Sequence, residues 1–151
     1  MLLIAATILL IDQLSKFLVC SKLVPGVSIP VIKNVFHISL VHNTGCAFGM
    51  FRYQTFFLTG LSMLTVVVIL IFYWRTARSE RMLRIGTGLL MGGACGNLID
   101  RLRFGYVIDF LDFQVWPVFN IADSAVTVGV ALIIWMMCRR KPELSSRMCG
   151  Q

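Results

Sequence analysis

Aspartate residues are the groups in this chain best suited to chemistry. The acidic residues are Asp12, Glu80, Asp100, Asp109, Asp112, Asp123 and Glu143. Two carboxylates held a few Å apart can hydrolyse a peptide bond without a metal or a nucleophile, because their like charges keep one of them protonated while the other ionises. Physics alone leaves two interpretations of such acids, a membrane aspartyl hydrolase or a proton-coupled carrier.

Asp12 and Asp100 each have a plain structural explanation. Asp12 and Lys16 have the (i, i+4) spacing that places an ion pair on one face of a helix. Asp100 precedes Arg101 directly, and Asn97 lies about one helical turn earlier, which favours a polar network at a helix end. Ionisable residues inside a membrane are rare unless they are paired or functional, so the structural and functional interpretations both stay open.

Asp123 has a simple structural explanation as a helix-capping residue, whereas Asp109 does not. Asn120 is a good helix N-cap, and Asp123 then falls in the first turn, where an acid favours the positive end of the helix dipole. Asp109 lies within an apolar run, so its side chain either points into a site or turns toward water. Asp112 shares this stretch and is the candidate for a solvated acid.

Other catalytic chemistries have little support in the sequence. The five cysteines form no CxxC pair, and Cys95 and Cys138 lie in apolar stretches, so a metal site is not expected. The two histidines, His37 and His42, have no partner of the HExxH type. Ser15 and Lys16 are adjacent and would point apart on a helix, and no GxSxG motif occurs.

The composition is that of a membrane protein. Hydrophobic residues make up 58% of the 151 residues and charged residues 14%, against about 25% charged in soluble domains. The net charge of +7 does not indicate nucleic-acid binding, because the basic residues punctuate apolar runs. A bilayer core needs about 20 apolar residues as helix. We predict one domain over residues 1–151 with four spans, at about 2–20, 55–74, 85–103 and 119–138.

Two segments of this layout differ from plain apolar spans. The first span contains Asp12 and Lys16, but it lacks the basic start of a signal peptide, and we interpret it as a retained span. The segment 22–53 is rich in β-branched residues and turn formers. We therefore predict an all-α membrane protein with a small β-structure between the first two spans.

Basic residues predict the orientation. Arg75, Arg78, Arg81 and Arg84 follow the second span, and Arg139, Arg140, Lys141 and Arg147 follow the last. By the positive-inside rule, both clusters and both termini are cytoplasmic. The segments 22–53 and 104–118 then face outward, and all five aspartates fall on the outer side.

Five motifs carry a family resemblance. They are "DQLSK" (12–16), "NTGCAFG" (43–49), "GGACGNLIDR" (92–101), "GYVIDF" (105–110) and "FNIADS" (119–124). Each motif is weak alone, but their order over essentially the whole chain resembles bacterial lipoprotein signal peptidase, or signal peptidase II. The resemblance implies an intramembrane aspartic endopeptidase that cuts diacylglyceryl-modified prolipoproteins just before the lipidated cysteine. It also implies an inner-membrane location, contact with membrane lipid, no cofactor or metal, and inhibition by globomycin.

The resemblance also assigns roles to residues. It implies that Asp109 and Asp123 are catalytic. The supporting or substrate-binding residues that it implies are Asp12, Lys16, Asn43, Gly45, Asn97, Asp100, Arg101 and Asn120. Of the catalytic pair, we expect Asp123 at its helix start to ionise more easily and act as the base, and Asp109 to hold the proton.

Two other functions explain less of the sequence than this one does. A proton-coupled carrier predicts acids spread through the bilayer depth and usually an internal repeat, whereas these acids cluster on one side and no repeat is visible. A four-helix scaffold or assembly factor would leave Asn43, Asn97 and Asn120 without a reason to lie beside the acids.

Overall fold

Four helices and three strands make up the computed structural model, which describes residues 1–45, 54–75 and 81–139. The elements in chain order are α1 (Leu2–Lys22), β1 (Ser28–Ile32), β2 (Phe36–Asn43), α2 (Thr55–Arg75), α3 (Arg81–Phe104), β3 (Val107–Asp112) and α4 (Ile121–Arg139). Cys46, Cys149, both glutamates and much of the two basic clusters lie outside the described residues.

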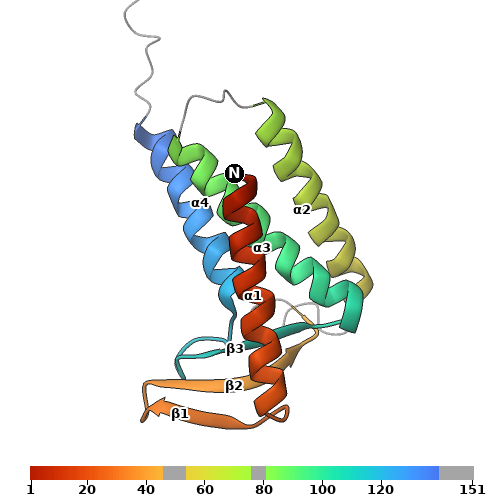
Figure 1. The fold of residues 1–151 in the computed structure, drawn as a ribbon, viewed down its shortest axis with the longest axis vertical. Helices are drawn as coiled ribbons and strands as arrows, with labels where there is room; N and C mark the ends of the chain where they lie inside the picture. Colours follow the sequence, from red (N-terminus) through yellow and green to blue (C-terminus); the bar gives the residue numbers. More distant parts are fainter. Residues whose placement is uncertain (46–53, 76–80, 140–151) are drawn as a thin grey trace, which may run out of the picture.

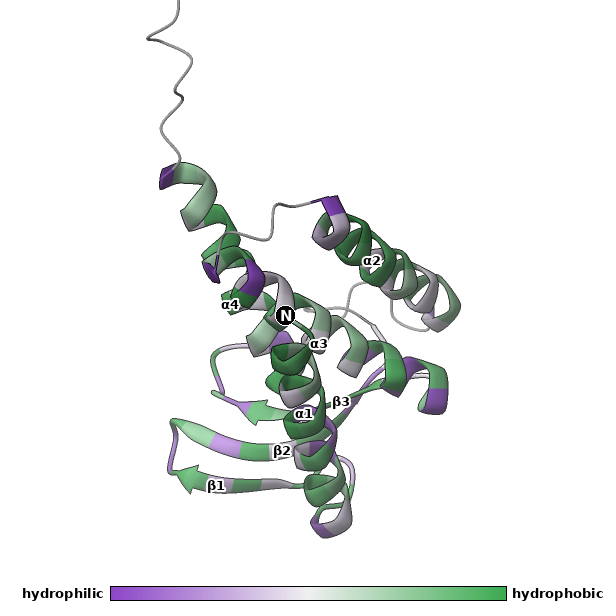
Figure 2. Cartoon of the chain, turned by 45° about the horizontal axis from the view of Figure 1, so that its top comes forward, coloured by the Kyte–Doolittle hydropathy of each residue, from purple (hydrophilic) through white to green (hydrophobic). Residues whose placement is uncertain are grey.

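All four helices are long and apolar enough to cross a membrane. Most of their large apolar side chains are exposed, including Phe17 on α1, Phe56 on α2 and Met137 on α4, which is expected where lipid replaces water as the solvent. Figure 2 shows apolar colour along the helices and hydrophilic residues mainly at helix ends and on the strands. The fold class predicted from the sequence is confirmed.

The centre of the bundle is α3, which packs against each of the other three helices. Its contact face is glycine-rich: a Cβ at Gly93 would overlap the carbonyl oxygen of Ala122 on α4, and one at Gly92 would lie 2.7 Å from that of Ala5 on α1. Small residues therefore let the backbones approach closely, as is common between membrane helices. α3 is also the least apolar of the four spans.

We predict that Gly93→Ala lowers the free energy of unfolding by about 1–3 kcal/mol, the usual cost of overpacking a tight contact. The methyl group would meet backbone that cannot move without separating α3 from α4. Thermal unfolding in detergent measures the change. Gly60→Ala on α2 is the matched control, since nothing lies within 4 Å of its added Cβ; equal melting temperatures for the two variants would contradict the prediction.

A three-stranded antiparallel sheet lies across one end of the helices, in the order β1-β2-β3 (Figure 1). β1 and β2 fall in the segment 22–53, where the sequence predicts β-structure. β3 is not expected from the sequence; it comes from the short connection between α3 and α4, and four of its six residues are buried. Its pairing with β2 brings Asp109 opposite Val41 and Val107 opposite Asn43.

Candidate active site

The first turn of α4 holds Asp123 in place. The Asp123 backbone N–H donates to Asn120 Oδ1 (2.9 Å), and the Asn120 backbone N–H donates to Asp123 Oδ2 (3.2 Å). These two bonds form a capping box, in which the cap and the third helical residue satisfy each other's backbone donors. The predicted N-cap is therefore confirmed, and it fixes the Asp123 carboxylate at the helix start.

Asp109 comes from β3 and is only 2% exposed. Asn120 Nδ2 donates to Asp109 Oδ1 (2.7 Å), and Asn43 Nδ2, at the end of β2, donates to Asp109 Oδ2 (2.8 Å). The Gly45 backbone N–H in turn donates to Asn43 Oδ1 (3.0 Å) and orients that amide. Asn120 thus binds both aspartates, Asp109 through its side chain and Asp123 through its backbone.

Asn97 on α3 connects Asp123 to a deeper set of charges. Its Nδ2 donates to Asp123 Oδ1 (2.7 Å), while its Oδ1 accepts from Lys16 Nζ (3.2 Å) and Asn120 Nδ2 (3.1 Å). The orientation of the amide follows from these partners: a flipped amide would place its oxygen against a carboxylate and its NH₂ against an ammonium.

Lys16 lies between two carboxylates in the bundle. Its Nζ is 2.8 Å from Asp12 Oδ2 and 2.8 Å from Asp100 Oδ2, and all three residues are at most 1% exposed. The ion pair predicted between Asp12 and Lys16 is confirmed, and Asp100 is its third member. With Asn97, the three donors of the ammonium are all used.

The two carboxylates of this charge cluster also accept hydrogen bonds from backbone N–H groups of the site. The Ala122 N–H at the start of α4 donates to Asp12 Oδ1 (2.9 Å), and the Ile108 N–H next to Asp109 donates to Asp100 Oδ2 (3.2 Å). The cluster therefore anchors both segments that carry Asp109 and Asp123. A buried ion pair with this many hydrogen bonds can offset its desolvation cost.

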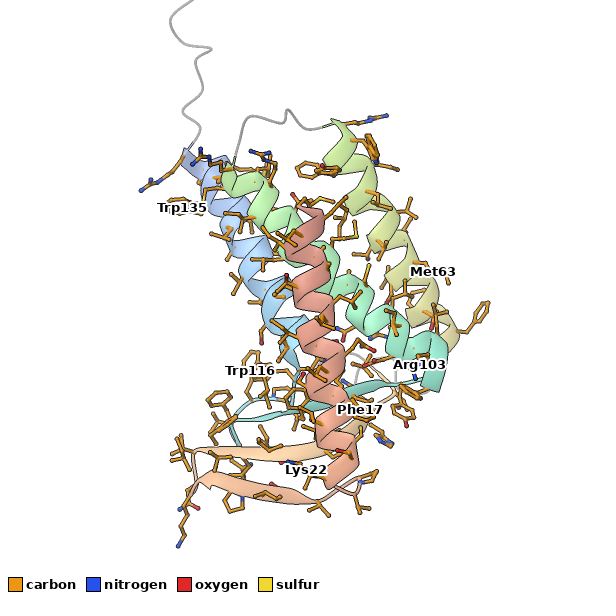
Figure 3. The ribbon with its side chains drawn as sticks, in the orientation of Figure 1. Phe17, Lys22, Met63, Arg103, Trp116 and Trp135 are labelled. Atoms are coloured by element: carbon orange, nitrogen blue, oxygen red, sulfur yellow. The ribbon has the colours of Figure 1, made fainter. Side chains whose placement is uncertain are left out.

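A cavity of about 910 Å³ opens beside the two aspartates. Asp109, Asp123, Asn43, Asn97 and Arg101 line its polar side. The rest of the lining is mostly apolar and comes from α4 and the segment before it, which includes Phe113, Val115, Trp116, Pro117, Val118 and Phe119. Figure 3 labels Trp116 near the sheet end of α4. The cavity can hold a peptide with an apolar attachment, and its lining is typical of ligand sites.

Asp109 retains its proton unusually well. Burial raises the pKa of Asp109 to about 7, with the negative charge of Asp123 as the second cause; the hydrogen bonds from Asn43 and Asn120 act in the opposite direction. A carboxylic acid that is partly protonated at neutral pH can donate a hydrogen bond to a substrate and act as a general acid.

The structure brings together all ten residues singled out from the sequence. Asn43, Gly45, Asn97, Arg101, Asp109 and Asp123 line the cavity, and Asp12, Lys16, Asp100 and Asn120 lie behind it. Asp112 does not line the cavity; it accepts from Ser39 Oγ (2.6 Å) and from the Gln114 N–H (2.8 Å).

Sequence reasoning missed two contributors. Gln13 Nε2 donates to Asp100 Oδ1 (3.0 Å) and Asp12 Oδ2 (3.2 Å); its position next to Asp12 was the available signal. Ser62 on α2 accepts from Arg101 Nη1 (3.3 Å), and an isolated serine in an apolar span gave no reason to expect this.

Comparisons with known proteins relate the chain to one family. Residues 4–139 match a family model described as signal peptidase (SPase) II. The chain is 46% identical over 136 residues to a lipoprotein signal peptidase of Moorella thermoacetica, covering 90% of this chain and 91% of that one. It is 48% identical over 127 residues to that of Halothermothrix orenii, covering 84% and 87%. A solved bacterial membrane enzyme superposes with a TM-score of 0.86 at 31% identity, over 93% of this chain and 91% of the other.

Proposed function

The chain belongs to the signal peptidase II family and removes signal peptides from lipoproteins, and we propose that it does so as an aspartic endopeptidase with Asp109 and Asp123 as the catalytic pair. The observation that carries the proposal is their shared setting. Both carboxylates line one cavity, and both are bound by Asn120. The alternative of a proton-coupled carrier has no support from the comparisons.

The two aspartates have different environments, and these support different roles. Asp123 at the helix N-terminus takes a proton from a water molecule as the water oxygen bonds to the scissile carbonyl carbon. Asp109, whose pKa is raised to about 7, donates its proton to the carbonyl oxygen. When the intermediate collapses, the C–N bond breaks, the nitrogen receives a proton from Asp123, and Asp109 regains its own from the former carbonyl oxygen.

The substrate is proposed to be a prolipoprotein cut just before its diacylglyceryl-modified cysteine. The apolar wall from Phe113 to Phe119 suits the acyl chains and the apolar signal peptide, which would remain in contact with membrane lipid. The side-chain amides of Asn43 and Asn97 donate hydrogen bonds to the two aspartates. They hold the carboxylates in position to act on a peptide backbone.

We also propose the inner membrane as the location, with cytoplasmic termini and the site at the outer surface. The end of α2, the start of α3 and the end of α4 lie at the same end of the helices, opposite the sheet (Figure 1). Arg75, Arg81, Arg84 and Arg139 are at this end, and the Arg139 guanidinium lies 4.0 Å from the Trp135 ring centroid. Arginine favours the cytoplasmic side, and tryptophan favours the membrane–water interface on either side.

The direct test is cleavage of a lipid-modified prolipoprotein by the purified protein in detergent. We expect a single cut before the modified cysteine that globomycin blocks and that chelators, serine reagents and thiol reagents leave unchanged. Loss of cleavage with a chelator or a serine reagent would contradict the aspartic mechanism.

The pH dependence of kcat/KM gives a second test. Asp109 must carry a proton, and with a pKa of about 7 it loses that proton as the pH rises, so activity should fall above about pH 7. Asn43 donates to the charged carboxylate and lowers its pKa. Asn43→Ala should therefore move the alkaline limb to higher pH, as the pH–rate profile would show.

Ser39→Ala is the control for this shift. Ser39 lies on the same strand as Asn43 but donates to Asp112, which does not line the cavity. Its alkaline limb should match that of the unmodified protein. An unchanged limb in Asn43→Ala would show that the titration belongs to another group.

A further inference from the structure

Arg101 is a cation that lines the cavity without a carboxylate partner. Its Nη1 donates to Ser62 Oγ (3.3 Å) and, at the limit of hydrogen bonding, to the backbone oxygen of Asn97 (3.5 Å). Within residues 1–45, 54–75 and 81–139, the ion pairs are those of Lys16, and no carboxylate pairs with Arg101. The guanidinium has five N–H donors, and its hydrogen bonds to these described residues use Nη1 alone.

Lys16 cannot play this part. Its three donors are used by Asp12, Asp100 and Asn97, and it is 1% exposed and absent from the cavity lining. Arg101 is thus the cation that the described part of the chain presents to the cavity.

Hydrolysis creates a new charge in this cavity. Water adds its oxygen to the carbonyl carbon, the C–N bond breaks, and at neutral pH the products are a carboxylate on the signal peptide and an ammonium on the lipoprotein. The carboxylate forms beside Asp109 and Asp123, in a largely apolar cavity. A carboxylate is strongly disfavoured there unless a cation and hydrogen-bond donors meet it.

We infer that Arg101 binds the C-terminal carboxylate of the released signal peptide, with Ser62 on α2 orienting the guanidinium. This inference rests on the proposed function, because that places the scissile bond beside the aspartate pair. A planar guanidinium matches a carboxylate through two parallel N–H···O bonds. The site therefore separates the product charges: the carboxylate lies at Arg101 and the new ammonium is left near the aspartates.

Binding of a matched pair of peptides tests the inference. The probes are one acetylated apolar peptide ending in alanine, made as the free acid and as the carboxamide, with affinities measured by calorimetry on the full chain in detergent. The acid should bind about tenfold or more tightly than the amide, as expected for hydrogen bonds to a charged group. In Arg101→Gln the order should reverse, because the aspartates then repel an unpaired carboxylate.

Arg103→Gln is the matched control. Arg103 lies on the same helix but does not line the cavity, and its guanidinium lies 4.9 Å from the Phe104 ring centroid (Figure 3 labels Arg103 at the end of α3). It should keep the full preference for the acid. Arg101→Lys keeps the charge but loses the planar guanidinium, so it should bind the acid only a few-fold more tightly than the amide. This variant replaces Arg101→Gln in the test if Arg101→Gln unfolds.

Equal binding of acid and amide to the unmodified protein would overturn the inference, as would an unchanged preference in Arg101→Gln. The peptides are not cleaved, so the result does not depend on which groups are catalytic. If Asp109→Asn stayed fully active while the acid preference held, the proposed function would fail and the carboxylate site would stand.

Discussion

Asp109→Asn and Asp123→Asn should each slow cleavage by about a thousandfold or more, since a positioned general acid or base contributes about 10²–10⁴. The two losses should not add in the double variant, because residues that act as one unit are removed together by the first substitution. The measurement is the single-turnover rate on a lipid-modified prolipoprotein, with abundance in the membrane and melting temperature recorded for each variant.

The hydrogen bonds explain why so small a change should matter. Asp109 accepts one amide N–H on each oxygen, from Asn120 and Asn43. Asparagine at this position would direct its own NH₂ group at the NH₂ group of Asn120 or of Asn43. Two donors cannot form a hydrogen bond, so these two side chains would move apart. Asp123 likewise accepts on both oxygens, from Asn97 and the Asn120 backbone. Each substitution therefore removes the titrating group and also loosens its neighbour.

Asp112→Asn is the matched control for both variants. Asp112 lies on the same strand as Asp109, but its partners are Ser39 and Gln114, away from the cavity. The same chemical change there should leave the cleavage rate within a few-fold of the unmodified protein. A normal rate in a folded Asp109→Asn or Asp123→Asn protein would show that the catalytic pair is wrongly assigned.

Local features of the site could be predicted because they depend on short spacings. An (i, i+4) spacing fixes the Asp12–Lys16 pair, and the Asn120 cap fixes Asp123 within one helical turn. Apolar length likewise predicts the helices. In these cases the backbone periodicity determines which side chains meet, whatever the rest of the fold does.

Long-range features could not be predicted in the same way. The approach of Asn43 to Asp109 depends on the register of β2 against β3, and this register shifts between Ile38 and Val41. Diagonal neighbours of this kind follow from strand pairing, not from composition. The hydrogen bond between Lys16 and Asn97 depends on how closely α1 approaches α3, and the glycines of α3 determine this distance.

Lys16→Met should lower the free energy of unfolding by about 3–5 kcal/mol, more than the other substitutions above, because it leaves Asp12 and Asp100 buried without a counter-ion. Melting temperature in detergent measures the loss. Lys22→Met is the control, since Lys22 is an exposed residue at the end of the same helix. Comparable melting temperatures for the two variants would mean that the charge cluster does not hold the helices together.

A stability loss alone would not show that Lys16 also positions the catalytic pair. Lys16 Nζ binds Asn97 Oδ1, which leaves the Asn97 NH₂ directed at Asp123. If Lys16 affects catalysis by orienting Asn97, then Asn97→Ala removes this connection to Asp123. Lys16→Met should therefore reduce kcat/KM much less in the Asn97→Ala protein than in the unmodified protein. Rates per folded molecule in a double-mutant cycle measure the difference. Strictly additive effects would mean that Lys16 supports the fold without orienting the site.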